Sequence, residues 1–387
     1  MNYYSGSLWL ALILFFHPDL LAQNSSSKPL IHGYIKDLQS LSFEEDASTL
    51  RSMNLFHNRL NFRWDISSEF TARLEARNRL FYGDQLKSMP GFGKQVARDE
   101  GLFSLTKLWV NEPALVLTST FDRASLKYSK GQIGITMGRQ RVNWGVNTIW
   151  NPMDIFNAYN FLDFDYEERP GSDAIRMQYF SSGFSAFELA YAAADRGRKH
   201  TAAALFKFNK WKYDFQVMGG MLDEDLTAGM AWAGNIKEAG FKGEVSAFRK
   251  IMGSEEGRDV LTYSVMADYS FKSSWYVSAA FLYIDNPLSV TSFMQASGAV
   301  SVSAKNLMPF RWSFYSGLQK MFNPVFSANV SIVYSPEKNS VILFPALAYS
   351  LADNLNLDLT AQSFFAQEKN RYVTEGTTLF LRFRWSF

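Results

Sequence analysis

Arginine side chains recur at intervals of two or four residues in three segments, and their type and spacing point to anion chemistry. A guanidinium group binds carboxylate or phosphate through parallel N–H donors. Residues two apart lie on the same face of a β-strand, so each segment would present a row of positive charge. The arginines predicted to line an aqueous lumen are Arg59, Arg63, Arg73, Arg77, Arg79, Arg382 and Arg384, with Arg176 and Arg311 as further candidates.

Two interpretations of these rows stay open. Rows of arginine beside a narrow aqueous space attract anions by Coulomb interaction. However, Asp65, Glu69 and Glu75 are interleaved with the arginines, and opposite charges pair across neighbouring strands. In that case the rows stiffen a wall and do not select a solute.

Catalytic chemistry has little support in the sequence. The chain has no Cys, which excludes thiolate zinc sites and cysteine nucleophiles. Outside the N-terminal segment, His32, His57 and His200 are scattered, and no Gly-x-Ser-x-Gly, P-loop or dinucleotide motif occurs. The sequence therefore predicts a protein that is not an enzyme, with no cofactor and no metal site. Lipid hydrolysis by His57 with a serine is a weaker alternative, and the net charge of +2 gives no argument for nucleic acid.

The elements that must position the arginines are β-strands. Polar and apolar residues alternate along most of the chain, as in 68–81, where Glu69, Thr71 and Arg73 oppose Phe70 and Ala72. The predicted strands lie near 30–39, 50–65, 68–82, 114–129, 132–142, 172–181, 184–194, 200–209, 212–221, 225–235, 239–250, 259–271, 275–285, 310–322, 326–335, 340–351, 354–366 and 375–387.

The connections between these strands alternate in length. The gap after each even-numbered strand is short, whereas most gaps after odd-numbered strands are longer, as at 83–113 and 286–309. Short turns at one end and long loops at the other are typical of a bacterial outer-membrane barrel. We predict an all-β, antiparallel up-and-down transmembrane barrel of 16 to 18 strands, wide enough for an aqueous lumen. Segment 100–110 leaves the strand count uncertain by two.

Both ends of the chain agree with an outer-membrane location. The apolar run Leu8–Phe16 is too short to span a bilayer and fits a secretory signal, so we predict a signal peptide over residues 1–22 and a barrel over residues 23–387. The last segment, Thr377–Phe387, looks like the closing strand of bacterial outer-membrane barrels. That resemblance implies recognition of the strand ending in Phe387 by the barrel-assembly machinery, with outer-membrane lipid as a second partner.

A constriction loop is predicted over residues 146–171. It is rich in aromatic residues and in acids, so we expect it to fold into the lumen and to turn its acids toward the basic wall. An external loop packed on a neighbouring molecule is the alternative, and Pro152 predicts a short helix capped by Asn151. The residues selected for this role are Trp150, Tyr159, Phe161, Asp163, Asp165, Glu167, Glu168 and Arg169.

The segment GRQRVNWGVNTIWNPMDIF resembles a porin-like outer-membrane barrel family of largely uncharacterised function. Its opening is also similar to that of the alginate-export barrels. The motif residues are Gly138, Arg139, Gln140, Trp144 and Gly145. The alginate-type resemblance implies that Arg139 lines the pore. By strand parity, however, Arg139 falls with Ile135 and Met137, on the side expected to face lipid.

These observations favour a channel for small polar or anionic solutes. A barrel that exports or imports an oligosaccharide or acidic polymer is the next hypothesis, because the aromatic loop offers surfaces on which sugar rings could stack. A plugged structural barrel is the third. The sequence leaves open the solute, the direction of transport and the oligomeric state.

Overall fold

The computed structural model describes residues 28–43, 50–99, 101–158, 160, 171–181, 185–193, 200–251, 259–287, 290, 293 and 302–387. The predicted signal peptide lies outside these ranges. Among the described residues, no helix is both long and apolar enough to cross a membrane.

All eighteen predicted strands are present, with small shifts at their ends. The strands are β1 (Leu30–Phe43), β2 (Arg51–Ser52), β3 (Asn54–Asp65), β4 (Phe70–Tyr82), β5 (Thr106–Glu112), β6 (Leu115–Lys130), β7 (Ile133–Gln140), β8 (Ser172–Phe180), β9 (Ala186–Ala192), β10 (Thr201–Lys210), β11 (Tyr213–Leu222), β12 (Asp225–Ile236), β13 (Ala239–Lys250), β14 (Val260–Ser270), β15 (Trp275–Ile284), β16 (Trp312–Asn323), β17 (Phe326–Ser335), β18 (Ser340–Ala352), β19 (Leu355–Glu368) and β20 (Arg371–Ser386). Two short helices, η2 (Gln85–Ser88) and α1 (Phe92–Val96), precede β5.

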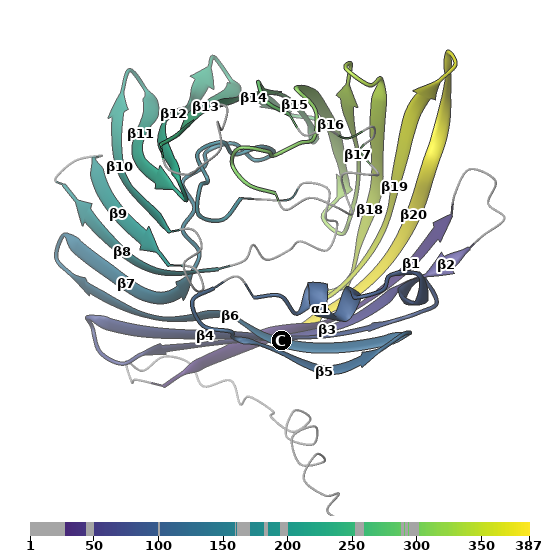
Figure 1. Ribbon diagram of the computed structural model, residues 1–387, viewed down its shortest axis with the longest axis horizontal. Helices are drawn as coiled ribbons and strands as arrows, with labels where there is room; N and C mark the ends of the chain where they lie inside the picture. Colours follow the sequence, from purple (N-terminus) through teal and green to yellow (C-terminus); the bar gives the residue numbers. More distant parts are fainter. Residues whose placement is uncertain are drawn as a thin grey trace, which may run out of the picture.

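The strands form one closed antiparallel sheet (Figure 1). Of the twenty strands in the described residues, β2 is a two-residue addition to β1, and β5 pairs with the first half of β6, above the point where β7 begins to pair with it. The remaining eighteen follow one another round the ring, and β20 pairs with β1 over ten residues. Reciprocal backbone hydrogen bonds of 2.9 and 3.0 Å between Gly33 and Phe387 extend this closure.

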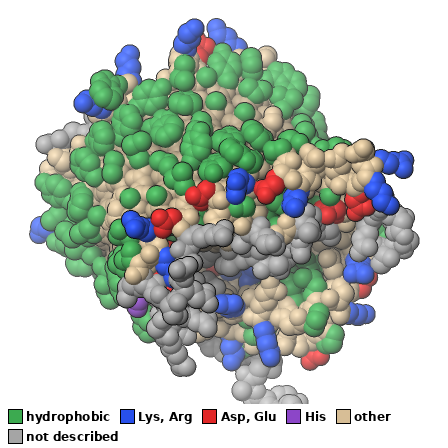
Figure 2. Space-filling view, turned by 45° about the horizontal axis from the view of Figure 1, so that its top comes forward, with side chains coloured by type: hydrophobic (Ala, Val, Ile, Leu, Met, Phe, Trp, Pro, Cys, Tyr) green, Lys and Arg blue, Asp and Glu red, His purple; other side chains and the backbone are tan. Residues whose placement is uncertain are grey.

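The outer face of the barrel is apolar. Outward positions of β20, such as Leu379, Leu381, Phe383 and Trp385, are 36 to 45% exposed. Figure 2 shows hydrophobic side chains covering a broad area of this face, with charged side chains gathered at its margins. A lipid environment requires such a surface, because a spanning sheet must satisfy its own backbone groups and expose apolar side chains.

The inner face is not uniformly hydrated. Residues 141–158, between β7 and β8, and residues 302–311, before β16, lie inside the ring (Figure 1). Two clusters of buried apolar side chains join these segments to inward positions of the wall between β8 and β19. A third cluster joins η2 and α1 to Leu38, Leu55, Phe81 and Val116 on β1, β3, β4 and β6.

Candidate functional site

The basic wall forms where the chain closes. Register places Lys36 of β1 opposite Arg384 of β20 on one side and opposite His57 of β3 on the other, and His57 opposite Arg79 of β4. The neighbouring inward pairs are Arg59 with Arg77 and Arg63 with Arg73. The predicted rows therefore do meet on four adjacent strands, because period-two alternation brings inward residues of neighbouring strands side by side.

The exposure of this wall changes along its length. At the periplasmic end, Arg73 is exposed and the Arg63 side chain is 49% exposed. Further up the barrel, Lys36 and Arg59 are fully buried and His57 is 2% exposed. The positive charge is therefore open to water at the periplasmic mouth and enclosed by protein at mid-height.

At mid-height the arginines are paired with acids. Arg59 donates to Glu75 at 2.5 Å and to Asp122 at 2.6 Å, and Arg77 donates to Asp122 at 2.8 Å. A β-bulge opposite Glu75 and Ala76 makes Asp122 an extra residue of β6 and turns it inward. This network supports the stiffening interpretation at mid-height. At the periplasmic end Arg63 is exposed but pairs with Asp65 at 3.1 Å, and Arg73 is exposed to water.

Near the closure the contacts of the wall are partly aromatic. The Arg384 guanidinium carbon lies 4.3 Å from the centre of the Tyr34 ring, and the Tyr34 and His57 rings are 5.3 Å apart. Neither ring nitrogen of His57 has a hydrogen-bond partner among the described residues. The cation over the ring orients Arg384 along the wall.

The other predicted arginines divide into paired and peripheral groups. Arg176 donates to Glu188 at 2.5 Å, and Arg382 donates to Asp358 at 2.9 Å. Arg311 precedes β16 at the extracellular rim, where it donates to the carbonyl of Asp285. It is exposed there, so it lies at the mouth of the barrel and not along its wall.

The described part of the predicted constriction loop does fold into the lumen, where Glu244 of β13 holds it. One carboxylate oxygen accepts hydrogen bonds from the backbone N–H of Val146 and Asn147 at 2.6 and 2.7 Å, and from the Asn151 amide at 3.1 Å. The other oxygen accepts from the N–H of Met153 at 2.9 Å. Glu244 is fully buried, so this single carboxylate satisfies the donors of a segment about a hundred residues away.

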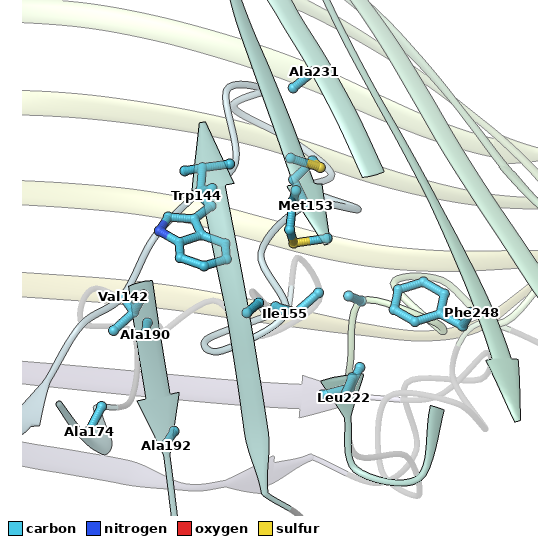
Figure 3. Close-up of a cluster of buried hydrophobic side chains, with 14 residues drawn as sticks. Val142, Trp144, Met153, Ile155, Ala174, Ala190, Ala192, Leu222, Ala231 and Phe248 are labelled. Carbon is cyan, nitrogen blue, oxygen red and sulfur yellow. The ribbon is translucent and has the colours of Figure 1, made fainter. Parts of the chain in front are cut away.

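Glu188 of β9 forms a second anchor. It accepts the indole N–H of Trp144 at 3.1 Å and is also paired with Arg176 and Lys207. Trp144 is 1% exposed and packs against the apolar cluster around Met153 (Figure 3). Trp150 is equally buried and lies edge to face with Tyr315.

The structure corrects two expectations about this loop. The helix predicted at Pro152 is absent, because the chain makes a turn there and the Asn151 side chain donates to Asn147 and Glu244 instead of capping. The two described tryptophans are buried, so they offer no surface on which a sugar could stack. Tyr159, Phe161, Asp163, Asp165, Glu167, Glu168 and Arg169 lie outside the described residues.

Arg139 is held by protein and does not line an open pore. It pairs with Asp173 at 2.8 Å and with Asp99 at 2.7 Å, donates to the carbonyl of Phe103, and is 5% exposed. By register it shares the outward side with Met137. The pore role implied by the alginate-type resemblance is therefore corrected: the guanidinium fastens the segment around Asp99 to β7 and β8.

The Asp99 carboxyl responds to the same contacts. Its burial raises the pKa, but hydrogen bonds from Arg139 and from the backbone N–H of Gly101 and Leu105 outweigh the burial. The pKa of Asp99 therefore lies below its usual range. Of the other motif residues, Gln140 donates to the carbonyls of Thr136 and Ala174 and braces the end of β7.

Three acidic residues of the site were missed by sequence reasoning: Asp122, Glu188 and Glu244. Asp122 depends on a bulge that breaks the alternation. Glu188 and Glu244 are each the only acid among the inward residues of their strands, beside alanines on β9 and beside Lys242, Ser246 and Phe248 on β13. A single acid on the inward face of a strand was the signal that could have identified Glu188 and Glu244. The described residues contain no cluster of His, Asp or Glu that could hold a metal ion.

The comparisons with known proteins support the fold. No protein-family model matches the chain, and no curated protein sequence matches it. OccAB4 of Acinetobacter baumannii aligns over 94% of this chain and 99% of its own, with a TM-score of 0.59 at 9% identity. OccK5 (OpdH) of Pseudomonas aeruginosa aligns over 93 and 98%, also with a TM-score of 0.59 at 9% identity.

The chain has the fold of an outer-membrane β-barrel. A structure of the outer-membrane protein OpdK from Pseudomonas aeruginosa with vanillate aligns over 92% of this chain and 99% of its own, with a TM-score of 0.58 at 10% identity. The closed eighteen-strand architecture and the outer-membrane location predicted from the sequence agree with these structures.

Proposed function

We propose that this chain is an outer-membrane channel for small anionic solutes. The observation that carries the proposal is the basic wall on β20, β1, β3 and β4. Its periplasmic arginines Arg63 and Arg73 are exposed, whereas loops cover much of the wall between β8 and β19. A solute in the remaining space passes beside fixed positive charge, which favours anions.

The chemistry of one similar structure supports an organic acid as the solute. OpdK has been solved with vanillate, an organic acid anion. A guanidinium fork fits a carboxylate in two-point contact, and the exposed Arg73 offers that contact, with Arg63 beside it and paired with Asp65. We therefore propose monocarboxylates as the first solutes to test.

The proposal is tested by reversal potentials across planar bilayers in a salt gradient. Two charges about 8 Å from a permeating anion each contribute ~0.5 kcal/mol in water. The double variant Arg63→Gln, Arg73→Gln should therefore lower the anion-to-cation permeability ratio at least about five-fold, because the same charges also repel cations. The matched control Lys338→Gln, Lys369→Gln removes the same charge from extracellular turns and should leave the ratio near that of the wild type. Cation preference in the wild-type protein contradicts the proposal.

A plugged barrel is the second candidate, and a specific observation favours it. Lys36 and Arg59 are fully buried, so the wall has no access to water at their height. A plugged barrel predicts no conductance in the wild-type protein and none after Glu244→Ala releases the loop. Discrete single-channel steps in the wild type would exclude this candidate.

A further inference from the structure

The periplasmic end of the barrel carries two lysine–tryptophan pairs on its outer face. Lys210 ends β10, and its ammonium nitrogen lies 4.4 Å from the centre of the Trp211 ring. Lys320 of β16 lies opposite Trp275 of β15, with 5.2 Å between the ammonium nitrogen and the ring centre. Both pairs lie beside short turns, which in outer-membrane barrels face the periplasm.

Both pairs lie at the edge of the apolar outer surface. Trp211 is 76% exposed and contacts Phe215, which stacks on Phe208. Aromatic residues gather where acyl chains meet headgroups. A lysine at this depth reaches its ammonium into the headgroup layer.

The turn that contains Trp211 has a backbone conformation that its two residue types disfavour. Trp211 and Lys212 have φ angles of 55° and 65°. A two-residue hairpin turn with both residues in the left-handed region is normally Asn-Gly or Asp-Gly. A bulky aromatic and a long cation occupy it here, which indicates that the side chains serve something other than the turn.

The two ammonium groups remain available to an anion. No carboxylate of the described residues lies within ion-pair distance of Lys210 or Lys320, and Lys320 donates to the carbonyl of Ser273. Lys212, Lys237 and Lys272 lie in the same set of turns, with Glu238 as a nearby acid. Asp214 and Asp353 are further acids at this end, but the lysines outnumber the acids of these turns, so their excess charge is positive.

We propose that the Lys210–Trp211 and Lys320–Trp275 pairs bind the phosphodiester headgroup of anionic glycerophospholipids in the periplasmic leaflet. The indole faces fix the depth of the barrel, and the ammonium groups select a headgroup with net negative charge. This inference does not depend on the proposed channel function, because neither pair faces the lumen.

Native mass spectrometry of the full-length protein with equal amounts of phosphatidylglycerol and phosphatidylcholine tests the proposal. The wild type should retain phosphatidylglycerol in preference. Lys210→Gln, Lys320→Gln should lower that preference about five-fold for each lysine, the factor that ~1 kcal/mol per basic residue predicts. The control Lys338→Gln, Lys369→Gln should leave it unchanged. Equal retention of both lipids by the wild type, or an equal fall in the control, would overturn the proposal.

A second variant separates lipid binding from turn stability. Trp211→Asn, Lys212→Gly installs the turn sequence that the backbone prefers, so its resistance to unfolding in urea should equal or exceed that of the wild type. Its preference for phosphatidylglycerol should nevertheless fall. If this variant keeps the full lipid preference, the Trp211 pair is not a headgroup site.

Discussion

The two halves of the barrel wall use their inward positions in different ways. Between β8 and β19, inward residues such as Leu205, Met218 and Leu282 are buried beneath loops that enter from the extracellular end. On β20, β1, β3 and β4, many inward positions carry lysine and arginine, although η2 and α1 cover the apolar Leu38, Leu55 and Phe81. Alternation thus decides which side of a strand faces inward, but the chemistry of each inward residue decides whether it meets protein or water.

The largest predicted effect comes from removing the anchor of the loop-covered half. Glu244→Ala leaves three backbone N–H groups and one amide without their buried acceptor. Each buried donor that is left without an acceptor costs about 1 to 3 kcal/mol. We expect lower stability in urea together with a larger single-channel conductance, because the loop leaves the wall. Glu238→Ala, in a periplasmic turn, is the control and should change neither.

The second largest effect concerns the basic wall on β20, β1, β3 and β4. Asp122→Asn weakens the contacts that hold Arg59 and Arg77, and a hydrogen bond to a charged group contributes about 2 kcal/mol. The barrel should become less stable and more anion-selective, since one negative charge leaves the wall. Asp214→Asn removes an acid that is bonded to Asn209 at the periplasmic end and should leave stability nearly unchanged. A fall in anion selectivity of the Asp122 variant would contradict the assignment of this half.

A pH effect separates the contacts inside the lumen from the ion pairs that Arg139 makes with Asp99 and Asp173. The lowered pKa of Asp99 means that its ion pair stabilises the segment at a pH above the ordinary carboxyl value of about 3.9. The stabilisation is lost as the pH falls through the lower value of the folded protein. Pepsin should therefore cut near residues 98–105 increasingly below pH ~4. Asp99→Asn should be cut at a rate that depends less on pH, and a wild-type rate that follows pepsin activity alone would contradict this.

The smallest effect sharpens the role of Trp144 in the loop-covered half. Trp144→Phe keeps an aromatic ring against the apolar cluster but removes the indole donor to Glu188. The expected cost is about 1.5 kcal/mol, the low end for a hydrogen bond to a charged group, because Arg176 and Lys207 still contact Glu188. Trp211→Phe, on the outer surface, is the matched control. Chemical denaturation with detergent-solubilised protein measures both, and an equal loss in the two variants would show that the Glu188 contact adds nothing.

The fold and the basic wall could be predicted from the sequence because both follow from period-two alternation. The alternation within each strand indicates which of its residues face inward, and closure of the ring then places Lys36 beside Arg384. The exposure of the wall could not be predicted, because the pairing of Arg59 with Asp122 depends on a bulge in β6. A single inserted residue reverses the parity of everything before it.

The packing of side chains inside the lumen could not be predicted from the sequence either. Glu244 meets Asn147 across 97 positions of sequence, and nothing local in β13 marks it as the acceptor for a loop. Trp150 belongs to the loop expected to fold inward and Trp144 to the motif before it, but the burial of both depends on the same distant walls. Aromatic content alone therefore suggested an open stacking surface where the structure has a packed one.

The seam between β1 and β20 has a consequence for how the cylinder is assembled. It joins segments more than three hundred positions apart, so it is the contact with the greatest entropic delay in folding. Until β1 and β20 pair, both strands have exposed edges that can pair with other chains. At Gly33, an added Cβ would lie 2.2 Å from the carbonyl oxygen of Arg59 on β3 and 3.1 Å from the Phe387 ring across the seam, so a larger residue there would disturb β1 on both sides and hinder closure of the barrel.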